Sequence, residues 1–242
     1  MRLKAIIWDV DGTLAETEEA HRCAFNQAFA EAGLPWHWSE ADYAALLTTT
    51  GGRERIARFM AGIGLAPDPA LVAALHPRKN AIYANLLAAG AVVPRPGVLR
   101  LIGEARTRGI ALAIATTTSR ANLEALLRHS FGPDADSWFP VIVAGEDVKA
   151  KKPDPEAYRQ ALTGLAREPA DCIAIEDSRN GLHAARGCAL VTLITPSRYT
   201  TSHDFSDAAR ICGSLDDQPH PVDVDDLDAL LMAVKRSPDQ SS

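Results

Sequence analysis

Two carboxylates stand one residue apart near the start of the chain, at Asp9 and Asp11, directly after an apolar run. This pattern is typical of a buried strand that delivers acidic residues at its carboxyl end. Because like charges that are close together and partly removed from water repel each other, a cation is needed to join them. A second acidic pair, Glu176 and Asp177, follows another apolar run. A set of carboxylates without Cys or His favours Mg²⁺ over zinc, so the sequence predicts a magnesium site.

The same residues have simpler explanations, which the pattern leaves open. Acidic residues after a strand often cap the next helix, and the later acidic pair fits that role equally well. Thr116 follows a further apolar run, at a position where threonine is commonly a helix N-cap. The basic run at Lys149, Lys151 and Lys152 is by default a solvated surface feature.

Five short apolar runs predict the strands of a parallel sheet, with helical patterns between them. The helical patterns cover roughly residues 98–108, 120–130, 155–166 and 179–187. The apolar runs are Leu3 to Trp8, Ile110 to Ala115, Val141 to Ala144, Cys172 to Ile175 and Leu190 to Ile194. Strands that alternate with helices predict an α/β fold with a doubly wound parallel sheet. Ligands of such sheets bind beyond the carboxyl ends of the strands, which is where the acidic and hydroxyl residues fall.

Residues 17–94 interrupt this alternation with helical patterns and no strand pattern. Glycine and proline turns divide this stretch into several helices, and a Pro-Arg-Pro-Gly segment marks the return to the alternating part. We expect Pro77 at the first position of the last inserted helix, directly after His76. The sequence therefore predicts a helical domain at 17–94, inserted into a core formed by 1–16 plus 95–242.

Composition and charge exclude several classes of function. The chain has 242 residues with 25 Lys plus Arg against 31 Asp plus Glu, a formal net charge of −6. This balance argues against non-specific binding to nucleic acid or to anionic membranes. No apolar stretch approaches the about 18 residues of a membrane span, and the longest N-terminal apolar run is too short for a signal peptide. The four cysteines form no CxxC pair, so we expect reduced thiols and a cytoplasmic protein.

The segment Asp9-Val10-Asp11-Gly12-Thr13-Leu14 resembles the first motif of the haloacid dehalogenase superfamily. Thr116, Lys152-Pro153 and Glu176-Asp177 match the other three motifs, in the family's order. Each match alone would be weak, but four in order are highly specific. The resemblance spans most of the chain. It implies a Rossmann-like core on which the helical insertion is a cap domain.

The resemblance implies that the enzyme forms a covalent phosphoryl intermediate. Asp9 would be the nucleophile that attacks phosphorus, and Asp11 the general acid and base. We expect neighbouring carboxylates to raise the pKa of Asp11 into a working range. Mg²⁺ would be held by Asp9, the backbone carbonyl of Asp11 and Asp177, with Glu176 as a direct or more distant partner.

The remaining motifs would bind the phosphate. By resemblance, the Thr116 hydroxyl and the Thr117 backbone N–H contact phosphate oxygens, and Lys152 contacts both the phosphate and the nucleophile. Charge balance supports one such lysine, because up to four carboxylates and a phosphate dianion exceed what one Mg²⁺ offsets. The dehalogenase branch lacks the acid that Asp11 supplies and needs no metal, so Asp11 argues for phosphate chemistry.

The insertion resembles the cap of the branch that contains β-phosphoglucomutase, phosphoglycolate phosphatase and the CbbY-like sugar-bisphosphate phosphatases. Its details are most similar to the CbbY-like proteins, and the similarity runs over nearly the whole chain. The segments that carry it are Ala15 to His21, Trp36 to Trp38, Thr48 to Ile56, Ala115 to Ser119 and Ala150 to Pro153.

The cap offers groups that suit a second phosphate. Gly51-Gly52 lets the backbone approach an anion at a helix start, and Arg53 and Arg55 add forked donors. A plain interhelix turn with two surface charges is the alternative that the cap alone leaves open. CbbY-like proteins commonly carry Lys where this chain has Arg53, which keeps the charge and alters the shape of the donor.

Other candidates for substrate binding lie around the expected site. Glu18 and His21 are three residues apart, hence on one helix face just after the catalytic loop, although a helical His is more often structural. The further candidates are Glu54, His76, Lys79, Thr118 and Asn122.

We therefore expect a Mg²⁺-dependent phosphatase that hydrolyses a sugar bisphosphate, and by family context xylulose 1,5-bisphosphate to xylulose 5-phosphate. The same context implies a carbon-fixing cell, where this reaction clears an inhibitor of Rubisco. The alternatives are a β-phosphoglucomutase-type phosphomutase, a phosphoglycolate-type phosphatase and, outside enzymes, an idle binding module on the same fold. We expect a monomer whose only partner is the small-molecule substrate.

Overall fold

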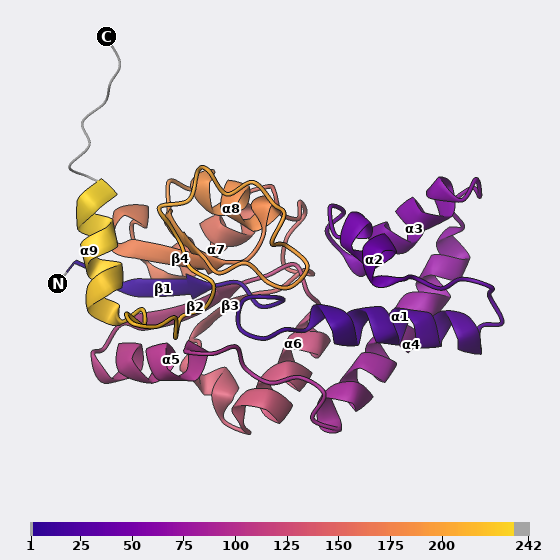
Figure 1. Ribbon diagram of the computed structural model, residues 1–242, viewed down its shortest axis with the longest axis horizontal. Coiled ribbons are helices and arrows are strands. Elements are labelled where there is room, and N and C mark those ends of the chain that lie inside the picture. Colours follow the sequence, from indigo (N-terminus) through magenta and orange to yellow (C-terminus); the bar gives the residue numbers. More distant parts are fainter. Residues whose placement is uncertain (1, 235–242) are drawn as a thin grey trace, which may run out of the picture.

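Six strands form one parallel sheet in the order β3-β2-β1-β4-β5-β6, within residues 2–234 that the computed structural model describes (Figure 1). The strands are β1 (Ala5–Trp8), β2 (Ala111–Ala115), β3 (Val141–Val143), β4 (Cys172–Glu176), β5 (Val191–Ile194) and β6 (Arg210–Ile211). The sheet confirms the predicted doubly wound fold. The sequence did not predict β6, because this strand has only two residues and no apolar run.

Helices cover both faces of the sheet and extend beyond one end of it (Figure 1). The α-helices are α1 (Glu18–Glu31), α2 (Glu40–Leu46), α3 (Gly52–Gly62), α4 (Pro69–Ala88), α5 (Val98–Thr107), α6 (Arg120–Leu126), α7 (Glu156–Leu165), α8 (Arg179–Arg186) and α9 (Val224–Val234). A π-helical turn η1 (Leu127–Phe131) and two 3₁₀ turns, η2 (Ala135–Trp138) and η3 (Pro169–Asp171), complete the set. Among residues 2–234, no helix is long and apolar enough to cross a lipid bilayer.

Alternating side chains of β1 pack into two separate apolar clusters. Ile6 and Trp8 pack with residues of α5 and α9, while Ala5 and Ile7 pack with residues of α7 and α8. All four side chains are fully buried. A strand that is buried on both faces explains why the sequence shows a continuous apolar run here rather than an alternating pattern.

The register of the sheet brings the two acidic motifs together. The chain enters at β1, adds β2 and β3 on one side, and then returns to place β4 on the other side of β1. Trp8 of β1 pairs with Ile175 of β4, so the residues that follow them emerge side by side at the carboxyl edge. This is the point where strand order reverses, and such points are the usual ligand sites of doubly wound sheets.

The predicted start of the last inserted helix is wrong. Helix α4 begins at Pro69 rather than at Pro77, because the Asp68 side chain accepts hydrogen bonds from the N–H groups of Ala70 and Leu71. Pro77 lies inside the helix. The helix continues through it, with Leu75 and other apolar side chains buried along its length. Packing of this face offsets the backbone hydrogen bond that a proline removes.

Helices α1 to α4 lie together beyond the carboxyl edge of the sheet (Figure 1). They share an apolar cluster that is centred on Phe25, Phe29 and Trp38, and Tyr199 of the core also packs into it. The two connections to the sheet run next to each other, since Ala15 and Pro94 form an isolated antiparallel bridge. The division of the chain at residues 17 and 94 stays our prediction, and from here we call these helices the cap.

We expect Ile7→Ala to lower the free energy of unfolding by about 2–5 kcal/mol, because it leaves a cavity beneath a fully buried strand. Leu99→Ala on α5 is the control, since Leu99 is 47% exposed and its loss should change stability by about 0.5 kcal/mol or less. Urea denaturation measures both. Equal losses in the two variants would contradict the assignment of β1 to the centre of the core.

Candidate active site

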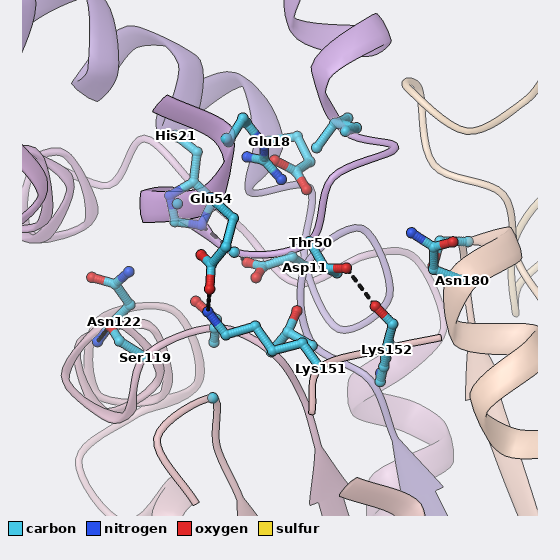
Figure 2. Close-up of a pocket in the computed structure, with 18 of the residues that line it drawn as sticks. Asp11, Glu18, His21, Thr50, Glu54, Ser119, Asn122, Lys151, Lys152 and Asn180 are labelled. Atoms are coloured by element: carbon cyan, nitrogen blue, oxygen red, sulfur yellow. Dashed lines mark hydrogen bonds and ion pairs between the residues drawn. The ribbon is translucent and has the colours of Figure 1, made fainter. Parts of the chain in front are cut away.

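A cavity of about 370 Å³ lies between the carboxyl edge of the sheet and the cap (Figure 2). Its lining contains all the residues that the sequence predicts to be catalytic, metal-binding or substrate-binding, except Thr116 and Glu176, which are buried behind the cavity wall. From the cap come Glu18 and His21 on α1, Gly51 to Arg55 at the start of α3, and His76 and Lys79 on α4. The core contributes Asp9, Asp11, Thr117, Thr118, Asn122, Lys152 and Asp177.

Asp9 is held rigidly at the end of β1. Its backbone N–H donates to the Ile175 carbonyl at 3.0 Å, which continues the β1–β4 ladder by one residue. The Thr13 hydroxyl donates to Asp9 Oδ2 at 3.0 Å, and Lys152 Nζ donates to Asp9 Oδ1 at 2.6 Å. Asp9 is only 7% exposed, yet it lines the cavity, so one small face of its carboxylate is open to a ligand.

Lys152 lies between two carboxylates and is 3% exposed, so it is not part of a solvated basic run. Its ammonium group contacts Asp9 Oδ1 at 2.6 Å and Glu176 Oε1 at 2.5 Å. Burial alone would lower the pKa of Lys152, but the two carboxylates outweigh it and raise that pKa above its usual value. The lysine therefore stays charged and offsets part of the negative charge around Asp9.

Glu176 is saturated by neighbours within the protein. Its Oε1 accepts from Lys152 and from the Tyr158 hydroxyl at 2.7 Å, and its Oε2 accepts from the Asp177 N–H at 3.3 Å. A Cβ atom at Gly181 would lie 1.9 Å from the Glu176 carboxyl carbon, so only glycine fits there. Glu176 is fully buried, and its contacts suit a residue that orients Lys152.

Asp177 completes a cluster of three carboxylates. Oxygens of Asp9, Glu176 and Asp177 lie within 4.8 Å of one another. Burial raises the pKa of Asp9 to about 7, and burial with repulsion from Asp9 raises the pKa of Asp177 well above its usual value. Ser178, not the acidic pair, caps α8 by accepting from the Gly181 N–H. The simple capping explanation for Glu176-Asp177 is therefore wrong.

This cluster fits a hard divalent cation. Every donor in it is a carboxylate oxygen, which is the ligand type that Mg²⁺ prefers. Burial, with repulsion between neighbouring carboxylates, raises the pKa values of Asp9 and Asp177, so their ionisation is unfavourable even with Lys152 nearby. A bound cation would stabilise the ionised carboxylates.

The expectation for the pKa of Asp11 is wrong. Burial would raise it, but His21 and Thr17 outweigh burial and lower the pKa of Asp11 to about 2. Its Oδ1 accepts from the Thr17 hydroxyl at 2.6 Å and lies 3.2 Å from His21 Nε2. The Asp11 carboxylate therefore interacts with the cap, rather than mainly with the other carboxylates. Lys79 Nζ lies 2.7 Å from His21 Nδ1 and extends this row of contacts into α4.

The threonine loop after β2 is folded back on itself. Thr116 is 1% exposed, and its hydroxyl accepts from the Thr118 backbone N–H at 3.1 Å. Ser119 is the N-cap of α6, so the alternative of Thr116 as the helix cap is wrong. Thr117 and Thr118 line the cavity, and the Thr116 hydroxyl fixes the turn that presents them.

Several contacts join the cap to the core at the mouth of the cavity (Figure 2). Lys151 Nζ donates to Glu54 Oε1 at 2.6 Å, and the Thr50 hydroxyl donates to the Lys152 carbonyl. Asn180 Nδ2 donates to the Thr48 carbonyl at 3.4 Å. Two of these contacts reach the loop that carries Lys152, so the position of the cap and the position of this lysine are linked.

Four residues that support the site were not predicted from the sequence. Tyr158 donates to Glu176, and the Thr200 hydroxyl donates to Asp177 Oδ2 at 3.2 Å. Arg95 is 8% exposed and donates to the Gly12, Thr195 and Pro196 carbonyls, which fixes the loop that follows Asp9. Tyr43 contacts both Glu18 and Arg55. Their only signal in the sequence is a polar group in an otherwise apolar or loop segment, which does not identify a partner.

Comparisons with known proteins agree with this geometry. Residues 3–188 match a family model described as haloacid dehalogenase-like hydrolase. The chain is 52% identical over 208 residues to protein CbbY of Rhodobacter capsulatus, covering 86% of this chain and 92% of that protein. The crystal structure of CbbY from Rhodobacter sphaeroides in complex with phosphate is similar, with a TM-score of 0.84 and 48% identity over 88% of this chain and 94% of that one. An aspartate-to-asparagine mutant of the same CbbY, in complex with xylulose-(1,5)bisphosphate, matches with the same TM-score, identity and coverage.

We expect Gly12→Ala to reduce hydrolysis of p-nitrophenyl phosphate, a general phosphatase substrate, by about 100-fold. Gly12 has φ +80°, and a Cβ there would lie 2.3 Å from Asp177 Oδ2, so the substitution displaces that carboxylate. Gly33→Ala is the matched control, because Gly33 has φ +68° and open space around it. Both variants should lose about 1–2 kcal/mol of stability from the left-handed backbone. Full activity in Gly12→Ala would show that the position of Asp177 is not critical.

Proposed function

Because the chain belongs to the haloacid dehalogenase-like hydrolases, we propose that it is a Mg²⁺-dependent phosphatase of sugar bisphosphates. The substrate that we propose is xylulose 1,5-bisphosphate, and the product is xylulose 5-phosphate. The observation that carries this proposal is the presence of cations at two separate parts of one cavity. Lys152 lies beside Asp9 in the core, while Arg53 and Arg55 line the cavity from the cap.

Two cationic regions suit a substrate with two phosphates. The phosphate that is removed would lie against Asp9 and Lys152, with the Thr117 backbone N–H beside it. The distal phosphate would lie at the start of α3, where Gly51 has φ +97° and the helix N-terminus favours an anion. A monophosphate would leave the cap arginines without an anionic partner.

In the proposed reaction, an Asp9 oxygen attacks the phosphorus, and the bond from phosphorus to the sugar oxygen breaks. While Asp11 contacts His21 and Thr17, its low pKa keeps it ionised. Substrate binding would displace these contacts and let Asp11 take up a proton, which it gives to the leaving oxygen. The Asp11 carboxylate then takes a proton from the water that hydrolyses the aspartyl-phosphate. Lys152 keeps Asp9 oriented throughout, and Glu176 keeps Lys152 in place. The attack on phosphorus therefore begins from a carboxylate whose direction is fixed by two hydrogen bonds.

Mg²⁺ would be held by Asp9, the backbone carbonyl of Asp11 and Asp177. The cluster of three carboxylates, which includes Asp9 and Asp177, supports that assignment. When bound, the ion would offset the repulsion between the attacking carboxylate and the anionic phosphate. Glu176 is the less suitable direct ligand, because it is fully buried and, unlike Asp9 and Asp177, does not line the cavity.

The substrate assignment draws on the relative whose mutant is in complex with xylulose-(1,5)bisphosphate. At 48% identity, the similarity supports a shared substrate class for the two proteins. We extend the proposal to a monomeric cytoplasmic enzyme of a carbon-fixing cell, in which the cap closes over the bound sugar and excludes water.

The direct test is phosphate release from a panel of sugar mono- and bisphosphates in the presence of Mg²⁺. We expect one phosphate per molecule of xylulose 1,5-bisphosphate, and reversible loss of activity when EDTA removes the metal. Asp9→Asn should reduce turnover by about 10⁴-fold or more, because the amide is no nucleophile. Asp136→Asn, at an exposed site in η2, is the matched control and should leave turnover unchanged.

Three results would contradict the proposal. Faster turnover of phosphoglycolate than of any bisphosphate would assign a different substrate. Transfer of the phosphate to another position of the sugar without net release would indicate a phosphomutase. Retained activity in Asp9→Asn would exclude the covalent step.

A further inference from the structure

We propose that Tyr43 is a positioning residue for substrate discrimination, which holds Glu18 and Arg55 of the cap in place through a single phenol group. This inference rests on the proposed function, because it concerns how the cap reads a sugar bisphosphate. Tyr43 lies on α2, whereas Glu18 begins α1 and Arg55 lies on α3. Three of the four helices of the cap therefore meet at this one hydroxyl.

The Tyr43 hydroxyl donates one hydrogen bond and accepts another. It donates to Glu18 Oε2 at 2.6 Å and accepts from Arg55 Nη1 at 2.8 Å, and both hydrogen bonds are buried. Glu18 and Arg55 line the cavity, but Tyr43 lies behind them and is fully buried. Tyr43 thus has no direct path to a ligand, and any effect that it has on substrate binding must pass through its two neighbours.

The surroundings of Tyr43 fix its position. Its ring packs against Phe25, Trp38 and Tyr199 with centroids 6.4, 6.0 and 5.6 Å away. The Arg55 guanidinium lies over the same ring, with Cζ 5.0 Å from its centroid. Burial raises the pKa of Tyr43 well above its usual value, so the phenol stays neutral and can donate to a carboxylate.

A neutral spacer between opposite charges has a specific consequence. Within residues 2–234, no ion pair forms directly between Glu18 and Arg55, although the same phenol contacts both. Two buried, opposite charges attract each other strongly, and they would otherwise pair with each other. The phenol hydrogen-bonds to the Glu18 carboxylate and to the Arg55 guanidinium, and so it keeps these two groups from forming a direct ion pair.

This arrangement leaves polar groups available to a ligand. Among the described residues, Glu18 Oε1 has no hydrogen-bond partner and is therefore free to accept one from a ligand. The nearest further contact of the guanidinium is long, from Arg55 Nη2 to the Thr49 carbonyl at 3.5 Å. Glu18 can accept from a sugar hydroxyl, and Arg55 can strengthen the field at the distal phosphate. A substrate without hydroxyls or a second phosphate would use neither.

The test compares Tyr43→Phe with the wild-type enzyme on two substrates, xylulose 1,5-bisphosphate and p-nitrophenyl phosphate. Phenylalanine keeps the ring and its packing and removes only the hydroxyl. We expect KM for the bisphosphate to rise about tenfold while kcat changes less than threefold, because the lost contacts bind substrate without touching phosphorus. The ratio of kcat/KM for the bisphosphate to that for p-nitrophenyl phosphate should fall by the same factor.

Tyr199→Phe is the matched control from the same aromatic cluster. The Tyr199 hydroxyl donates to Glu19 Oε2 at 2.5 Å, and Glu19 does not line the cavity. We expect the ratio of the two kcat/KM values in Tyr199→Phe to stay at the wild-type value. An equal fall of this ratio in both variants would show that Tyr43 contributes only to packing of the cap, which would contradict the inference. An unchanged ratio in Tyr43→Phe would also overturn it.

A double-mutant cycle tests whether Tyr43 acts through Glu18. If it does, Tyr43→Phe should raise the KM for the bisphosphate much less in a Glu18→Gln background than in the wild type. Independent, additive effects on KM would overturn the inference. The wild-type enzyme separates this result from the larger proposal: if wild type does not prefer the bisphosphate to p-nitrophenyl phosphate, the proposed function itself fails, whatever Tyr43→Phe does.

If Tyr43→Phe does not fold, Arg55→Lys replaces it in the same cycle with Glu18→Gln. Lysine keeps the charge and lacks the fork that reaches the phenol. Coupling between positions 55 and 18 in the KM for the bisphosphate would support a joint unit, and additivity would overturn it.

Discussion

The shared ammonium group of Lys152 is the interaction on which the rest of the site depends. Asp9, Glu176 and Asp177 lie within 4.8 Å of one another in a largely buried place, where repulsion and desolvation both oppose ionisation. Lys152 contacts two of these three carboxylates. Without it, Asp9 would keep only the Thr13 hydrogen bond to its side chain and would lack the positive charge that lies beside it. The remaining negative charge is what makes a divalent cation a fitting partner for the site.

The fold supplies this interaction from distant parts of the chain. The β1–β4 register places Asp9 beside Glu176 and Asp177, and the loop before α7 carries Lys152 to them. The cap then acts on the same groups, because Thr50 contacts the Lys152 carbonyl and His21 contacts Asp11. The position of the cap and the orientation of Asp9 and Asp11 in the core are thus physically connected.

Much of this could be predicted from the sequence, because apolar runs that end in acidic residues identify buried strands and their carboxyl ends. The choice of Lys152 among three nearby lysines came from the family motif, since composition cannot show which ammonium group is buried. The low pKa of Asp11 could not be foreseen, because it depends on a cap residue ten positions away. Tyr43 gave no signal, since its role arises only where three helices meet. Pro77 was misplaced because packing along α4 outweighs the local preference of proline.

The most direct test of the convergence of Asp9, Lys152 and Asp177 at one site is a crystal structure of the enzyme with Mg²⁺ and beryllofluoride. Beryllofluoride is a small mimic of a carboxylate-bound phosphoryl group. We predict beryllium bonded to an Asp9 oxygen, Lys152 in contact with its fluorides, and one Mg²⁺ that both Asp9 and Asp177 bind. Beryllofluoride bound away from Asp9, or Mg²⁺ bound without Asp177, would contradict the convergence of these groups on one reaction centre.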